Sequence, residues 1–179
     1  MKVFAFISIL SVARADWTCD DCTAVVSSMS DYLTSEMSIS NQIAILLAEV
    51  CPLDDNPEEC LSALPEFWAK LAAVLWPGYY NPGAPWMCGE LCVVKGIREI
   101  NCDECLAGLV ASFDQMLSEQ AIASIIEGLS GDAFCGSDNS VCQSVVAELI
   151  PLALPALFSD PDPVLGASIC NNAIPDICS

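Results

Sequence analysis

The 179-residue sequence has no histidine, and it has only five basic residues against 24 acidic ones. Without histidine, neither a Ser-His-Asp nor a Cys-His catalytic arrangement can be built. The shortage of lysine and arginine argues against nucleic acid as a partner, because phosphate binding needs basic side chains. The excess of carboxylates also opposes docking on anionic membranes at neutral pH. We therefore expect neither an enzyme nor a nucleic-acid-binding protein.

Motifs for metals and cofactors are also scarce. Cys-x2-Cys occurs at 19–22 and 102–105, a spacing that zinc sites use, but histidine ligands are absent and disulfides can account for every cysteine. Neighbouring carboxylates such as those of Asp54 and Asp55 lie in predicted turns, and their spacing does not match an EF-hand. We expect no metal site and no cofactor.

The first fifteen residues predict a secretory signal peptide. Lys2 precedes an apolar run at 3–12, and Ala13-Arg14-Ala15 fits a small-x-small cleavage site, although a cut after Ala13 fits the same rule. Removal of residues 1–15 leaves three basic residues against 24 acidic ones, a formal charge of −21. We expect no later apolar stretch to span a bilayer, since proline and charge interrupt them all. The mature chain is therefore expected in an oxidising compartment, either secreted into the extracellular space or in the lysosomal lumen.

The twelve cysteines form one six-member pattern that occurs twice, with an offset of about 83 residues between the two copies. In an oxidising compartment an even cysteine count indicates disulfides. The pattern predicts two tandem domains, 16–94 and 101–179, joined by a linker at 95–100. The first set of cysteines is Cys19, Cys22, Cys51, Cys60, Cys88 and Cys92, and the second is Cys102, Cys105, Cys135, Cys142, Cys170 and Cys178.

Apolar residues recur at helical spacing in both repeats, and no segment alternates with period two, so the sequence predicts an all-α fold. Repeats near 80 residues bury only a small core, and disulfides are expected to supplement it. The expected helices are 22–33, 41–50, 56–76 and a short one with Cys88 and Cys92 in repeat one, then 102–117, 119–129, 140–158 and a stretch through Cys170 in repeat two.

Local signals set some of the expected helix ends. Asn56 is a candidate N-cap, followed by proline at the first helical position and by Glu59, which could close a capping box. Trp76-Pro77-Gly78 is a stop signal. Pro151 and Pro155 are expected to kink their helix, which suits either a hinge or an ordinary packed bend.

Six cysteines per repeat allow fifteen pairings, and the sequence alone does not choose among them. Helical geometry favours a nested plan, because cysteines three or four positions apart project from one face of a helix and could join two antiparallel end helices by two rungs. The remaining two cysteines flank a turn and would pair locally. This plan gives Cys19–Cys92, Cys22–Cys88 and Cys51–Cys60 in repeat one, and Cys102–Cys178, Cys105–Cys170 and Cys135–Cys142 in repeat two.

The repeated pattern resembles the saposin B-type domain, here in tandem over nearly the whole mature chain. The resemblance rests on C-x2-C, a long gap, two cysteines around a short loop, a second long gap and two final cysteines. It implies four or five amphipathic helices per domain, in a leaf that can open, with the same nested pairing. It also implies interaction with lipids or membranes, as in the sphingolipid activators of lysosomes. The spacing of the final cysteines departs from the family pattern in both repeats, which affects the expected helix ends.

The candidate lipid-binding surface is apolar and comes from both repeats. Tryptophan favours the boundary between hydrocarbon and water. A helix that is apolar on nearly all sides needs a second surface to cover it, which could be lipid, the other repeat or a second copy of the chain in a homodimer. The alternative is that these side chains only fill a core. The predicted lipid-binding residues are Leu46, Phe67, Trp68, Leu71, Leu75, Trp76, Trp86, Val146, Leu149, Ile150, Leu154 and Phe158.

These features together predict a secreted protein that binds or presents lipids. Carboxylates have ordinary pKa values around 4, so acidification should remove most of the negative charge and strengthen association with membranes. One alternative is a membrane-lytic antimicrobial or pore-forming effector, which is less favoured because such proteins usually reach bacterial membranes through lysine and arginine. Another is a secreted signalling or structural protein that uses its apolar faces for assembly.

Overall fold

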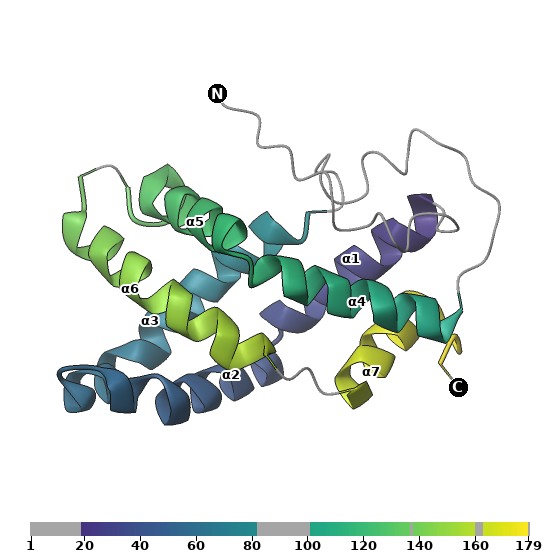
Figure 1. Cartoon of the computed structure of the whole chain (residues 1–179), viewed down its shortest axis with the longest axis horizontal. Coiled ribbons are helices and arrows are strands. Elements are labelled where there is room, and N and C mark those ends of the chain that lie inside the picture. Colours follow the sequence, from purple (N-terminus) through teal and green to yellow (C-terminus); the bar gives the residue numbers. More distant parts are fainter. Residues whose placement is uncertain (1–18, 82–100, 137, 160–162, 179) are drawn as a thin grey trace. The chain divides into compact units, whose positions relative to one another are not determined.

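The computed structural model describes residues 19–81, 101–136, 138–159 and 163–178 of the chain (Figure 1). Every regular element in these residues is a helix, and they contain no strand, which confirms the all-α prediction. The predicted signal peptide 1–15, the linker 95–100 and the helix with Cys88 and Cys92 lie outside the described residues.

The described residues of repeat one, 19–81, form three α-helices and one short 3-10 turn. They are α1 (Cys19–Thr34), α2 (Glu36–Glu49), η1 (Cys51–Leu53) and α3 (Pro57–Tyr79). Helix α2 begins five residues before the predicted start, because Ser35 caps it and accepts a hydrogen bond from the backbone N–H of Ser38 at 3.3 Å.

Helix α3 begins at the predicted proline but continues past the predicted stop at Trp76-Pro77-Gly78. A proline inside a helix frees the carbonyl four residues before it, here that of Ala73. Ala73 and Pro77 are both exposed, so water can satisfy that carbonyl. The predicted stop is therefore wrong by a few residues.

Repeat two follows the same plan, and its helices match the predicted ranges within one or two residues. They are α4 (Cys102–Met116), α5 (Glu119–Gly128), the π-helical turn η4 (Leu129–Ala133), α6 (Ser140–Phe158) and α7 (Pro163–Ala173). Helix α6 is continuous through Pro151 and Pro155. Neither proline ends it, since residues 147 and 151, whose carbonyls the prolines leave free, are exposed.

The two repeats interrupt their first two helices in the same way. Ser35 and Ser118 each adopt an extended backbone conformation, with φ/ψ of −65°/148° and −66°/144°. Each serine accepts a hydrogen bond from the backbone N–H three residues later, at 3.3 Å and 3.2 Å. One extended serine is thus the whole connection from α1 to α2, and Leu117 with Ser118 connects α4 to α5.

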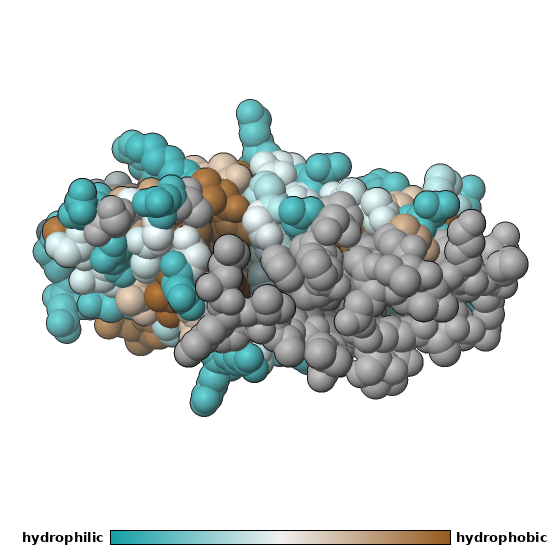
Figure 2. Space-filling model, turned by 90° about the horizontal axis from the view of Figure 1, so that it is seen from above, coloured by the Kyte–Doolittle hydropathy of each residue, from teal (hydrophilic) through white to brown (hydrophobic). Residues whose placement is uncertain are grey.

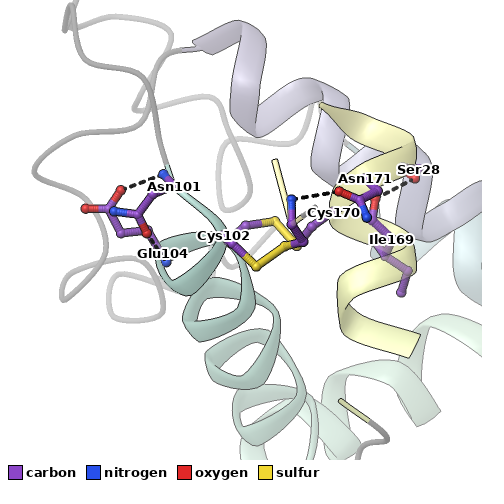
Figure 3. Close-up of a disulfide and its surroundings, with 9 residues drawn as sticks. Ser28, Asn101, Cys102, Glu104, Ile169, Cys170 and Asn171 are labelled. Atoms are coloured by element: carbon purple, nitrogen blue, oxygen red, sulfur yellow. Dashed lines mark hydrogen bonds between the residues drawn. A yellow bond between two sulfur atoms is a disulfide. The ribbon is translucent and has the colours of Figure 1, made fainter. Parts of the chain in front are cut away.

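Asparagines lie at the N-termini of three further helices. At α3 the expected box takes another form: the Asn56 amide donates to Glu59 Oε2 at 2.8 Å, while the Asn56 backbone N–H donates to Asp54 Oδ1 at 2.7 Å. A reciprocal capping box forms at α4, where Asn101 and Glu104 exchange two hydrogen bonds of 3.0 Å between side chains and backbone (Figure 3). At α6, Asn139 Oδ1 accepts from the Cys142 N–H at 3.1 Å.

The described helices belong to two compact units, and each unit takes segments from both repeats. Unit 1 comprises residues 1–32, 80–115 and 161–179, and it holds α1, α4 and α7. Unit 2 comprises residues 33–79 and 116–160, and it holds α2, α3, α5 and α6 with the turns η1 and η4. The predicted domains 16–94 and 101–179 describe the repeats along the chain, and they stay a prediction.

Unit 1 is held by disulfides and by contacts between its helices. Cys102–Cys178 and Cys105–Cys170 connect α4 to α7 and to the turn that follows it (Figure 3). Ser28 on α1 donates to the carbonyl of Ile169 on α7 at 3.2 Å. Gly166 allows a close approach, because a Cβ atom there would lie 2.9 Å from Leu106 Cδ2. Segments of both repeats therefore pack together in this unit.

Unit 2 contains two helical hairpins, one from each repeat. Cys51–Cys60 closes the turn between α2 and α3, and Cys135–Cys142 closes the turn between α5 and α6. Together with the two bonds of unit 1, these four disulfides join the same cysteines as the nested plan. Cys19 and Cys22 are disulfide-bonded as well, whereas their predicted partners Cys92 and Cys88 lie outside the described residues.

The disulfides of repeat two should differ in their effect on stability. Replacing Cys102, Cys105, Cys170 and Cys178 by alanine removes both nested bonds, opens a loop with a sequence separation of 76 residues and is expected to lower the free energy of unfolding by at least about 4 kcal/mol. The same change at Cys135 and Cys142 opens a separation of 7 and should cost about 2 kcal/mol. Urea unfolding followed by circular dichroism measures both, and an equal loss in the two variants would contradict the expectation.

Candidate functional site

The predicted lipid-binding residues form the interior of unit 2. Phe67 is half-buried, and Trp86 lies outside the described residues. In this state the apolar faces fill a core, as the alternative in the sequence analysis proposed, and they are not an open surface. The buried members of the predicted set are Leu46, Trp68, Leu71, Leu75, Trp76, Val146, Leu149, Ile150, Leu154 and Phe158.

This interior is made where a hairpin of one repeat meets the hairpin of the other. Trp76 of α3 contacts Phe158 of α6 edge to face, with ring centroids 5.5 Å apart and planes at 83°. Phe67 of α3 contacts Phe134, which follows η4, at 5.5 Å and 88°. Such edge-to-face pairs are the favoured geometry for aromatic rings. The two repeats thus cover each other's apolar helix faces within unit 2.

A buried polar cluster inside the repeat-one hairpin is missing from the predictions. Gln42 is only 5% exposed and lies on α2. Its side-chain amide donates to the carbonyl of Leu33 and to Ser38 Oγ, both at 2.9 Å. Its carbonyl oxygen accepts from the indole N–H groups of Trp68 and Trp76, at 2.9 Å and 3.1 Å. All four hydrogen-bonding positions of the amide are used, so the cluster is satisfied despite its burial.

Repeat two keeps the burial at the equivalent positions but not the polar groups. Counting from the capping serines, Ser38 and Gln42 correspond to Ala121 and Ile125, which are buried. Counting from Cys60 and Cys142, the two tryptophans correspond to Ile150 and Phe158, which are also buried. The signal for this cluster in the sequence is a glutamine within an apolar helix, followed by two tryptophans eight residues apart on the next helix.

The outer side of unit 2 is also apolar in places. Figure 2 shows brown apolar residues among teal polar ones at the left of the view. Glu148 is the only charged residue of α6. By length and composition alone, α6 could cross a membrane, although a core helix of a soluble protein meets the same criteria, and about a third of it is buried in the protein. The expectation that no later stretch is long and apolar enough is therefore wrong for Ser140–Phe158.

The electrostatics of the described residues are dominated by carboxylates. Lys70 is the only basic residue among them, and its Nζ lies 2.6 Å from Glu66 Oε1 on the exposed side of α3. The hydrogen bond and the charge of Lys70 lower the pKa of Glu66. At pH values above the ordinary carboxyl pKa, this ion pair contributes to the stability of the fold. The contribution is lost as the pH falls through the lowered pKa of Glu66, and it is small because solvent screens the exposed pair. Burial raises the pKa of the Tyr79 phenol, which stays neutral at physiological pH.

No group of three or more histidine, cysteine or acidic side chains in the described part of the chain could hold a metal ion. Comparisons of the chain with models of protein families, with curated proteins and with solved structures found no match. Any assignment of function therefore depends on the cysteine pattern, the helices and the two apolar faces.

Replacing Gln42 by leucine should destabilise the protein by about 2 to 4 kcal/mol, because two buried indole N–H groups and the Leu33 carbonyl lose their partner. Guanidinium unfolding followed by circular dichroism measures the change. Asn41→Leu is the matched control, since Asn41 is the exposed neighbour on the same helix, and it should shift stability by less than about 0.5 kcal/mol. Equal stability of the two variants would show that the cluster contributes nothing.

Proposed function

We propose that the chain is a secreted, non-enzymatic protein of the saposin B type that binds or presents lipids. Its support is the doubled cysteine pattern, the all-helical fold and the four described disulfides, a combination compatible with an extracellular or secreted location. Lysosomal delivery belongs to the same proposal, because the acidic lumen would protonate part of the carboxylates of the chain.

The observation that carries the proposal is the way the apolar faces of α3 and α6 are covered. Helix α6 packs against α2 of the other hairpin, and its Phe158 contacts Trp76 of α3. Each described disulfide joins two cysteines of the same repeat. The α2–α3 and α5–α6 hairpins could therefore separate without breaking any of these bonds. Separation would expose to lipid the side chains at the contact between the hairpins, among them Phe158.

Lipid is the partner that best fits such a surface. Separated hairpins would present the apolar side chains that meet at their contact, such as Phe158 of α6, and burial of apolar surface is strongly favourable. Acyl chains offer a conformable apolar surface of this kind. Tryptophan at its margin suits the boundary between acyl chains and headgroups.

Mass spectrometry of lipids that co-purify with the secreted protein tests the proposal directly. We expect one class of lipid in roughly stoichiometric amount, released by organic extraction. A variant with Trp76 and Phe158 both changed to alanine, if it stays helical by circular dichroism, should carry less lipid. Purified wild-type protein that neither carries lipid nor takes it up from vesicles would contradict the proposal.

Membrane association should strengthen as the pH falls, because protonation of the carboxylates progressively lowers the charge of −21, by about a third at pH 4.5 for ordinary carboxyl pKa values. Sedimentation at pH 7.5 and pH 4.5 with vesicles that contain an anionic phospholipid measures this. We expect at least about tenfold more protein bound at pH 4.5, and high salt at pH 7.5 should recover part of the difference by screening. Equal binding at both pH values would refute the pH dependence.

One observation favours a second candidate function, that of a membrane-lytic effector. Helix α6 is apolar and long enough to cross a bilayer by length and composition. The presence of only one basic residue in the described residues argues against attraction to anionic bacterial membranes. Release of a trapped dye from vesicles distinguishes the two functions, since lipid transfer leaves the vesicles sealed and lysis does not.

A further inference from the structure

Both hairpins of unit 2 turn at the same end of the unit, on the left in Figure 1. Each turn is closed by a local disulfide, Cys51–Cys60 in one hairpin and Cys135–Cys142 in the other. Phe134 precedes Cys135 and contacts Phe67 of α3, so the second turn is anchored on the first hairpin. Gln143 further orders this turn, because its side chain donates to the carbonyls at 130 and 136, at 3.1 Å and 2.9 Å. The turn of the second hairpin therefore lies against α3 of the first hairpin in this arrangement of the unit.

Exposed aliphatic side chains lie at the end of unit 2 where the two hairpins turn. Leu53 is 70% exposed in η1 and Leu61 is 50% exposed in the first turns of α3. Val141 and Val145, at the start of α6, are 73% and 40% exposed. We call these four the hairpin-end residues. The repeats differ in sequence here, yet each hairpin presents two aliphatic side chains beside its disulfide.

The chemistry of these residues suits a lipid surface better than a protein partner. The energetic centres of protein interfaces are enriched in tryptophan, tyrosine and arginine. The exposed large hydrophobic residues of the described chain are all methionine, isoleucine, leucine or valine. Exposed short aliphatic side chains can instead enter the boundary between headgroups and acyl chains of a membrane.

The charges around the hairpin ends select the kind of lipid. No basic residue lies near them in the described chain, since Lys70 is further along α3 and paired with Glu66. The acidic side chains at this end would therefore repel anionic headgroups. A zwitterionic surface carries no net charge and would not be repelled. The acidic groups at this end are Glu49, Asp54, Asp55, Glu58, Glu59, Glu127, Asp132 and Asp138.

We infer that the hairpin-end residues insert into a zwitterionic membrane surface and that this end of unit 2 is the first contact with lipid. The inference rests on the proposed function and names the surface through which that function begins. The contact needs no separation of the hairpins, because the four side chains are already exposed.

The test uses the full-length secreted protein and phosphatidylcholine vesicles at pH 4.5. The double variant Leu53→Ser and Val141→Ser removes one exposed side chain from each hairpin end. It should lower the vesicle partition coefficient about tenfold or more, from the apolar area lost to the membrane. The matched control is Met37→Ser with Val110→Ser, which removes two exposed side chains away from the hairpin ends and should change partitioning less than about twofold.

Hydrogen exchange of the wild-type protein gives an independent measurement. Vesicles should protect amides at 51–61 and 138–145 before they change exchange in the buried faces of α3 and α6. If the wild-type protein binds vesicles and the hairpin-end variant binds equally well, this inference is overturned while the proposed function stands. If the wild-type protein binds only anionic vesicles, the assignment of a zwitterionic surface is wrong. If it binds no vesicles and carries no lipid, both the inference and the proposed function fail.

Discussion

The mutual burial of two apolar helix faces, one from each repeat, is the interaction on which unit 2 depends. Trp76 near the end of α3 contacts Phe158 at the end of α6, and α6 also packs against α2. Neither hairpin could keep such a face in water alone, because a two-helix hairpin has no second layer to cover it. The carboxylates on the outside keep the assembled chain in solution, and the apolar faces hold it together. Lipid would have to compete with the other repeat for the same surface.

The disulfides limit which parts of the chain can take part in that competition. In unit 1, two bonds fix α4 to α7, and in unit 2 each hairpin has one bond at its turn. The polar cluster around Gln42 lies entirely within repeat one, in the α2–α3 hairpin and at Leu33 near the end of α1. It would therefore remain intact if the hairpins separated. Repeat two has only apolar side chains at those positions, so its hairpin relies more on its disulfide and on the other repeat.

Much of the local structure could be predicted from the sequence because its causes are local. The nested cysteines, the helix starts at Pro57 and Ser140 and the apolar periodicity all depend on neighbours along one or two helices. The exceptions also have local causes. Helix α3 passes Pro77, and α6 passes two prolines, because the freed carbonyls belong to exposed positions. Helix α2 begins early because Ser35, upstream of the predicted start, already caps it by accepting a hydrogen bond from the Ser38 N–H.

The composition of the units could not be predicted, and the reason is the repeat itself. A periodic pattern states which face of a helix is apolar, but it does not state which helix will cover that face. Since the two repeats carry the same burial pattern, α3 could be covered by helices of its own repeat or by those of the other. Polar groups usually decide between such alternatives, but the cluster at Gln42 is confined to one hairpin and does not favour either partner.

The same ambiguity gives the candidate site its capacity to change. Two coverings that bury similar faces differ little in hydrophobic free energy, so modest forces can shift the balance between them. Charge is one such force, because carboxylates crowd the surface and repel one another until they are protonated. In water, acidification would therefore favour hairpins that cover each other's apolar faces. It would also reduce the electrostatic barrier to contact with a membrane. The apolar faces then either remain paired with each other or bind lipid, depending on whether a lipid surface is present. A lipid surface can compete because it offers more apolar area than the second repeat does.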